Sequence, residues 1–122
     1  MNKISICNYI DIAHVSIVES TIGNNSILKN GNTWFRLQAN AKITYQSTTE
    51  NPDAGTLNHE TVTIQAETQY LDALLNNKQY YILRLFTNQG SFTLGSLQYP
   101  AIKTVTGDKM RKTIQFAAVS QL

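Results

Sequence analysis

The segment from Thr33 to Gln46, TWFRLQANAKITYQ, alternates apolar with mostly polar residues over its whole length. One set of alternate positions is apolar and consists of Phe35, Leu37, Ala39, Ala41, Ile43 and Tyr45. A period of two residues is typical of a β-strand that buries one face and exposes the other. Because the segment is longer than an ordinary strand, we expect it to bend or to be shared between two sheets.

Further segments of the chain also have the character of strands. Alternation within 61–68 gives one apolar face, formed by Val62, Ile64 and Ala66. The segment 79–88, QYYILRLFTN, is apolar on both faces apart from Arg84, which is typical of a central strand. β-branched and aromatic residues predict the remaining strands over 10–18, 91–96, 101–106 and 111–119.

One short segment has helical spacing instead. Leu71, Leu74 and Leu75 lie at positions i, i+3 and i+4, and Asn76-Asn77 ends the run. We therefore expect a short helix, at about residues 70–77, laid over an open edge of the core. The predicted fold is a single mainly β domain over 1–122, an antiparallel β-sandwich or barrel of about seven strands with one short helix.

Two segments are predicted to be loops. The first is GNNSILKNGN, residues 23–32, where Asn-Asn and Asn-Gly are turn signals. The second, residues 47–60, is interpreted either as a long hairpin tip or as a flexible arm that becomes ordered on a neighbouring subunit. Under the second interpretation the candidate subunit-contact residues are Asn51, Pro52, Asp53, Gly55, Thr56 and Leu57.

The surface is polar without being strongly charged. Charged residues make up 15% of the chain, against about 25% in an average domain. The net charge of +2 is too small to require a polyanionic partner. Lys and Arg number four against five Asp and Glu in residues 1–60, and six against three in residues 61–122, so the C-terminal half is mildly basic.

Motifs for catalysis or metal binding are missing from the sequence. Cys7, His14 and His59 have no ligand-type spacing, and a single cysteine excludes an intramolecular disulfide. The sequence contains no G-x-S-x-G motif, and its eight carboxylates are scattered. We therefore expect a protein that is not an enzyme, with no catalytic site, no metal site and no cofactor.

The N-terminal segment does not have the features of a targeting sequence. Polar residues interrupt MNKISICNYIDIAHVSIV, unlike the apolar core of a signal peptide. Apolar runs also stay well below the ~20 residues that cross a bilayer. We expect no contact with a membrane, and a protein that stays in the cytoplasm or leaves it as part of an assembly.

Nucleic-acid binding is the second hypothesis that the residues allow. Aromatic residues alternate with arginine as on platforms that stack single-stranded bases. The candidates are Trp34, Arg36, Tyr80, Arg84, Lys109, Arg111 and Lys112. Three strands, a helix and two strands also match the order of the OB barrel. Against this, Phe35 and one of Tyr80 and Tyr81 belong to apolar faces. A carbohydrate-binding module, which stacks sugar rings on exposed Trp and Tyr, is a third hypothesis.

The C-terminal third, residues 80–120, resembles small β-rich structural proteins encoded by phages and prophages of Bacteroides-type bacteria. The resemblance rests on an apolar strand, a short turn, a Gly-Ser-x-x-Tyr-Pro corner, and a last pair of strands with basic residues after their turn. The corner consists of Gly95, Ser96, Tyr99 and Pro100, and the basic residues are Lys109, Arg111 and Lys112.

This resemblance implies a tail or neck subunit of a virion that assembles into a ring or tube. Its partners would then be copies of itself and other virion proteins, in the host cytoplasm during assembly and in the virion afterwards. Surfaces rich in Thr, Asn and Gln suit that role, because they lose less solvation than charged surfaces when they are buried between subunits. The Gly-Ser-x-x-Tyr-Pro corner would be an element of shape, since Pro100 belongs at the edge or start of a strand.

Overall fold

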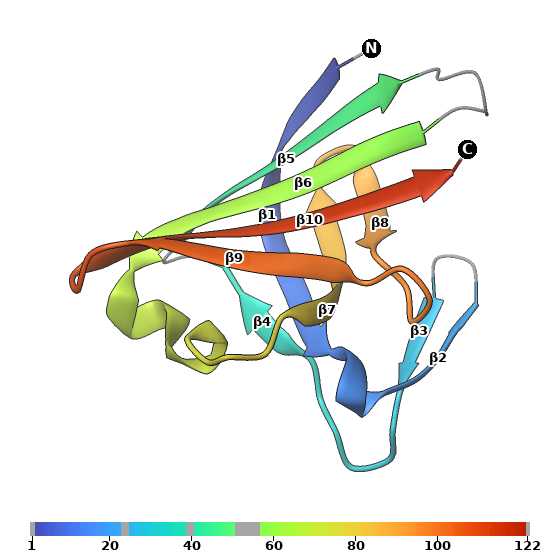
Figure 1. Ribbon diagram of the computed structural model, residues 1–122, viewed down its shortest axis with the longest axis horizontal. Helices are drawn as coiled ribbons and strands as arrows, with labels where there is room; N and C mark the ends of the chain where they lie inside the picture. The colour runs from blue at the N-terminus through green and yellow to red at the C-terminus, as the bar shows by residue number, and fades with distance from the viewer. Residues whose placement is uncertain (1, 23–24, 39–40, 51–56, 122) are drawn as a thin grey trace.

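The computed structural model describes residues 2–22, 25–38, 41–50 and 57–121 as a mainly β molecule with antiparallel strands (Figure 1). The strands are β1 (Asn2–His14), β2 (Val18–Ile22), β3 (Asn25–Leu28), β4 (Phe35–Leu37), β5 (Ala41–Glu50), β6 (Leu57–Glu67), β7 (Tyr80–Thr87), β8 (Gly90–Leu94), β9 (Ala101–Gly107) and β10 (Arg111–Gln121). Two 3₁₀-helices, η1 (Val15–Ile17) and η2 (Thr68–Leu74), connect them. The predicted mainly β fold is confirmed.

Six of these strands close into a barrel in the order β1-β5-β6-β10-β9-β7. The ring closes because β1 pairs with β5 through residues 2–6 and with β7 through residues 7–14. β4 and β8 extend the sheet beyond the ring, on β1 and β7 respectively. The side chains inside are apolar, and the largest fully buried ones include Phe116, Ile43, Ile64, Leu85 and Ile114.

The alternating segment 33–46 is shared between two strand pairings, as its length suggested. It divides into β4 and β5, which both pair with β1. Leu37 and Thr44 are seven positions apart, whereas their partners Ile10 and Ile6 are four apart, so the ladder cannot run through unbroken. Leu37, Ile43 and Tyr45 are buried as the alternation predicted. Ala39 lies outside the described residues.

The predicted helix is present but differs in type and position. Instead of residues 70–77 it covers Thr68–Leu74, and it is a 3₁₀-helix. Residues at i and i+3 eclipse one another in this conformation, so Leu71 and Leu74 share the buried side. Leu75 packs on the same core from just beyond the helix.

Two predictions for the N-terminal region were wrong. The first strand starts at Asn2, well before the predicted residue 10, and ends at His14, whose Nδ1 accepts a hydrogen bond from the amide of Ser16. The predicted loop 23–32 contains β3, which pairs with β2. This hairpin is stabilised by a second small core on the outside of the barrel, formed by Ala13, Val18 and Ile82 with Val15, Ile17, Leu28 and Trp34.

The predicted arm, residues 47–60, overlaps the paired part of β5 and β6 at both of its ends. β5 and β6 stay paired from Ser47 opposite Glu60 to Glu50 opposite Leu57, so both ends of the expected excursion belong to the ladder. Of the candidate contact residues, Asn51, Pro52, Asp53, Gly55 and Thr56 lie outside the described residues. Leu57 begins β6 and also pairs with β10.

The Gly-Ser-x-x-Tyr-Pro corner is a tight turn between β8 and β9. Gly95 has φ +84°, and a Cβ there would lie 2.8 Å from the amide nitrogen of Ala101. Two hydrogen bonds close the turn, from the amide of Ser96 to the carbonyl of Tyr99 and from the amide of Tyr99 to the hydroxyl of Ser96. Glycine is needed at this corner because another residue would be strained and would collide with the backbone.

A buried lysine holds η2 against the barrel. The ammonium of Lys103 donates to the carbonyl of Leu74 at 2.6 Å and to the carbonyl and side-chain oxygen of Asn76 at 3.2 and 3.1 Å. It also lies 5.2 Å from the ring centre of Tyr81. Burial lowers the pKa of Lys103, and these neutral acceptors replace the water that the charge has lost.

We expect Lys103→Met to lower the free energy of unfolding by about 1–3 kcal/mol, because the carbonyl of Leu74 in η2 and that of Asn76 just after it lose this donor. Lys109→Met, at an exposed position in the turn after β9, should change the free energy of unfolding by less than about 0.5 kcal/mol. Urea unfolding of the two variants at neutral pH measures the difference. Equal effects would show that the Lys103 hydrogen bonds do not stabilise the fold.

Candidate functional site

A buried carboxylate lies between two arginines on the outer face of β1. Asp11 is opposite Arg36 of β4 and opposite Arg84 of β7, so the three residues form one row across three strands. Arg36 donates from Nε at 2.8 Å and from a terminal nitrogen at 3.1 Å. Arg84 donates from a terminal nitrogen at 2.7 Å. Asp11 is 1% exposed, whereas the side chains of Arg36 and Arg84 are 49% and 36% exposed.

The two arginines determine the charge state of this carboxyl. Burial alone would raise the pKa of Asp11, but the hydrogen bonds and positive charges of Arg36 and Arg84 outweigh it and lower the pKa below 3.8. Asp11 is therefore an anion at neutral pH. With two guanidinium groups beside one carboxylate, the row carries a surplus of one positive charge.

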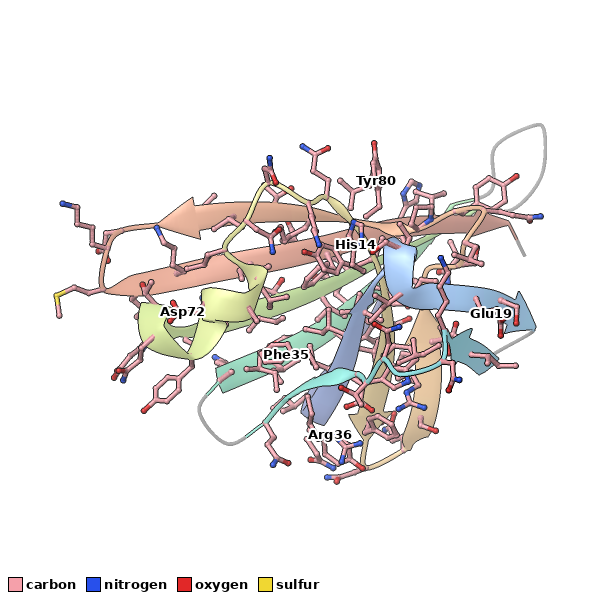
Figure 2. The ribbon with its side chains drawn as sticks, turned by 90° about the horizontal axis from the view of Figure 1, so that it is seen from below. His14, Glu19, Phe35, Arg36, Asp72 and Tyr80 are labelled. Atoms are coloured by element: carbon pink, nitrogen blue, oxygen red, sulfur yellow. The ribbon has the colours of Figure 1, made fainter. Side chains whose placement is uncertain are left out.

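Aromatic rings pack against both guanidinium groups. Arg36 lies 4.4 Å from the ring centre of Tyr9, and Arg84 lies 4.2 Å from that of Trp34. Tyr9 and Phe86 stack on each other with ring centres 4.4 Å apart. We call this set the arginine–aromatic cluster; it consists of Asp11, Arg36, Arg84, Tyr9, Phe86 and Trp34. Figure 2 shows Arg36 at the lower side of the molecule.

The structure brings together some of the predicted nucleic-acid residues and separates the others. Trp34, Arg36 and Arg84 belong to the cluster. Tyr80 lies on the opposite side in Figure 2. Lys109 lies in the turn between β9 and β10, and Arg111 and Lys112 are the first two residues of β10. Since Asp11 already binds both arginines, the cluster offers phosphate groups less charge than its sequence suggested.

Sequence reasoning missed half of the cluster. Tyr9, Asp11 and Phe86 were not candidates, because their partners lie far away in the chain: Arg36 is 25 residues and Arg84 is 73 residues from Asp11. One signal was available in YIDIAHV, where an acidic residue interrupts an apolar segment. An acid in such a segment needs a charged partner if the strand is covered on both faces.

A second surface lies on the outer face of the sheet β5-β6-β10-β9 and is largely uncharged. One row across the strands consists of Thr44, Thr63, Gln115 and Thr104. The next row consists of Gln46, Thr61, Ala117 and Ile102, and continues to Tyr80 of β7. Charged residues of this face with described side chains lie beyond the first row, at one end: Lys42, Glu67 and Arg111.

The opposite end of this face exposes apolar side chains. Tyr80 and Ile102 are adjacent and are 48% and 50% exposed, and Val119 is 47% exposed. Ala117 is opposite Ile102 and two positions from Val119, so these side chains share the outward direction. We call the four residues Tyr80, Ile102, Ala117 and Val119 the apolar patch.

A polar group also lies near the end of the barrel where β5 ends and β6 begins. Glu60 accepts hydrogen bonds from the hydroxyl of Tyr45 at 3.3 Å and from the side-chain amide of Asn58 at 2.9 Å. Burial raises the pKa of Glu60, although these hydrogen bonds act in the opposite direction. Both partners are neutral, so the group is not a carboxylate pair for acid–base chemistry.

The three possible metal ligands of the sequence, Cys7, His14 and His59, have different surroundings. His14 is held by Ser16, whose hydroxyl lies 2.8 Å from Nδ1, and it packs edge-on against Tyr81. Cys7 is buried in the barrel core, and His59 lies in β6. Within the described ranges, no three His, Cys, Asp or Glu residues are grouped so that they could hold a metal ion.

Comparisons with known proteins give no assignment: no family model, curated protein or solved structure matches this chain. Among the described residues, no helix has the length and apolar character needed to cross a membrane.

We expect Asp11→Asn to lower the free energy of unfolding at pH 7 by about 1.5–3 kcal/mol, because the neutral amide removes both ion pairs and leaves only one side-chain oxygen to accept hydrogen bonds from the arginines. The folded-state pKa of Asp11 lies below the unfolded value, so its contribution is present above that value and is lost as the pH falls through the folded pKa. Urea unfolding between pH 2 and pH 7 should therefore show wild type and variant converging at the acidic end. Asp72→Asn, at an exposed position, is the control.

We expect the thiol of Cys7 to be unreactive in the folded protein, since burial raises the pKa of Cys7 to about 11. At pH 8 its reaction with a chromogenic disulfide should be at least about a hundredfold slower than in urea-unfolded chain, because the thiolate is the reacting species. Comparable rates in the two states would show that the barrel opens at β1.

Proposed function

We propose that this chain is a non-enzymatic structural subunit of a bacteriophage or prophage virion, in the tail or neck, that assembles through contacts with copies of itself. The observation that carries the proposal is the apolar patch, which lies at one end of a largely uncharged sheet face. The resemblance of residues 80–120 to phage structural proteins supplies the setting. The patch supplies a surface on which assembly can begin.

The apolar patch is suited to subunit contact because its burial removes apolar area from water at little polar cost. Three large side chains contribute to it, and Tyr is among the residues enriched at binding hot spots. Contiguous apolar side chains on a soluble protein often mark an interaction site. Single exposed residues such as Ile27 of β3 do not form such a group and need no functional explanation.

The neighbouring Thr and Gln side chains extend the surface that a second subunit can cover. Hydroxyl and amide groups lose less solvation than charges on burial, and they can hydrogen-bond across an interface. The charged residues of this face whose side chains the structure describes lie at the far end, so they stay at the rim when the apolar patch is at the centre. This arrangement of an apolar centre and a polar rim is typical of protein interfaces.

The nucleic-acid hypothesis has less support than assembly. Its residues are divided among the arginine–aromatic cluster, the apolar patch and the turn after β9, so they do not form one track for a phosphate backbone. In OB barrels the ligand face lies on the second and third strands. The corresponding strands here are β5 and β6, whose central outward residues are Thr, Gln and His.

We expect light scattering to show oligomers of the wild-type chain that grow with concentration, and Ile102→Lys to shift the midpoint of this growth at least about tenfold upward by placing a charge in the apolar patch. The control is Ile27→Lys. Ile27 and Ile102 are 49% and 50% exposed, so the two substitutions cost the monomer similar amounts.

Thermal unfolding of both variants should be similar, which separates assembly from folding. A wild-type chain that stays monomeric at millimolar concentration would overturn the proposed function. Oligomers that are equally sensitive to Ile27→Lys and to Ile102→Lys would show that the patch is not the contact.

A further inference from the structure

We infer that the arginine–aromatic cluster is a second contact surface, which binds the acidic, aromatic outer side of η2 from another copy of this chain. The inference rests on the proposed function, because it names a second contact of the same assembly. It concerns a different side of the molecule, so it can fail independently.

The composition of the cluster is that of a binding hot spot. Trp, Tyr and Arg are the residues most enriched where alanine substitution weakens interfaces. Here one side chain of each kind, together with Phe86 and a second arginine, is at least partly exposed on neighbouring strands. Their mutual stacking fixes the side chains before any partner arrives, which reduces the entropy lost on binding.

The charge of the cluster specifies an acidic partner. Arg36 uses Nε and one terminal nitrogen on Asp11, and Arg84 uses one terminal nitrogen, so each guanidinium keeps a terminal nitrogen that no described residue occupies. The surplus positive charge is compensated by no other described carboxylate. One carboxylate from outside would make the row neutral and accept these free N–H groups.

The outer side of η2 has the complementary chemistry. Asp72 is exposed, and no described residue forms an ion pair with it. Tyr70 precedes it by two residues and is also exposed, so the outer side of the helix carries both a carboxylate and a phenol ring. The ring can stack on a guanidinium while the carboxylate accepts its hydrogen bonds.

The positions of the two surfaces favour contact between different copies. In Figure 2, Asp72 lies at the left on η2, Arg36 at the lower side on β4, and Tyr80 of the apolar patch at the upper side. A contact between two different patches is heterologous, and it links copies head to tail. Glu19, an exposed acid on β2 at the right of the same view, belongs to another side of the molecule and provides a matched control.

The first experiment reverses the charge of Asp72. Light scattering should show that Asp72→Lys weakens growth of the assembly by about tenfold or more in concentration, the size expected for a lost charge pair at an interface. Glu19→Lys, with the same change in net charge, should leave growth as in wild type. Arg36→Gln should act like Asp72→Lys, and thermal unfolding of each variant reports whether the fold is kept.

The second experiment locates the contact with cysteine pairs that leave Asp72 and Arg36 in place. Copies with Gln38→Cys, next to the cluster on the chain, are mixed with copies with Ala73→Cys under mild oxidation. Both positions are exposed, whereas the native Cys7 is buried and should not react. A non-reducing gel should show the mixed disulfide at least about tenfold more than a mixture of Gln38→Cys with Glu19→Cys.

The outcomes separate the two proposals. If wild type assembles and Asp72→Lys assembles equally well, the η2 contact is wrong and assembly through the apolar patch stands. If both cysteine mixtures cross-link equally, the contact is wrong as well. If wild type never assembles, the proposed function fails, and this contact fails with it.

Discussion

One long strand, β1, pairs with both β5 and β7, and this pairing determines most of the structure. β1 pairs with β5 through its first residues and with β7 through the rest, so the sheet closes on itself. Closure leaves Ile10 and Ile12 fully inside the core. It also fixes where the outward residues of β1 point, because successive side chains alternate between the two faces of a strand. Asp11 therefore faces outward between β4 and β7, at a place that neighbouring side chains cover.

That closure buries Asp11, which costs desolvation free energy. Burying an isolated carboxylate away from water costs several kcal/mol. Asp11 stays buried and charged because two arginines, through three hydrogen bonds, replace the solvent. The arginines come from the two strands that flank β1, so the ion pairs also fix β4 to the barrel. β4 is three residues long, and its ladder alone would hold it weakly. Tyr9 and Trp34 then pack against the two guanidinium groups, which stay partly exposed.

Local patterns in the sequence predicted the parts of this fold that depend on burial alone. The alternation of 33–46 and 61–68 identified strands and their buried faces, since a one-residue shift would expose every apolar side chain. Features that depend on distant contacts were not predictable in this way. β3 reads as a loop until Leu28 is seen to pack with Val18 and Ile82 outside the barrel. The spacing of Leu71 and Leu74 suits the buried side of either an α-helix or a 3₁₀-helix, so it did not predict the type of η2. The cluster was half predicted for the same reason: Trp34, Arg36 and Arg84 are conspicuous, but the row needs Asp11 from another strand.

The two proposed contacts could form together only if they are separate in the fold. The apolar patch belongs to β7, β9 and β10, and the arginine–aromatic cluster to β1, β4, β7 and the residue before β4. Both include residues of β7, yet Tyr80 and Arg84 lie at different heights along it, so one partner does not displace the other. An uncharged contact and an ion-paired contact also respond differently to salt, since screening weakens the exposed pair and leaves apolar burial intact. If the chain assembles as proposed, salt would therefore remove the head-to-tail contact first, and the rotation between copies at that contact would decide whether the subunits close into a ring or continue as a tube.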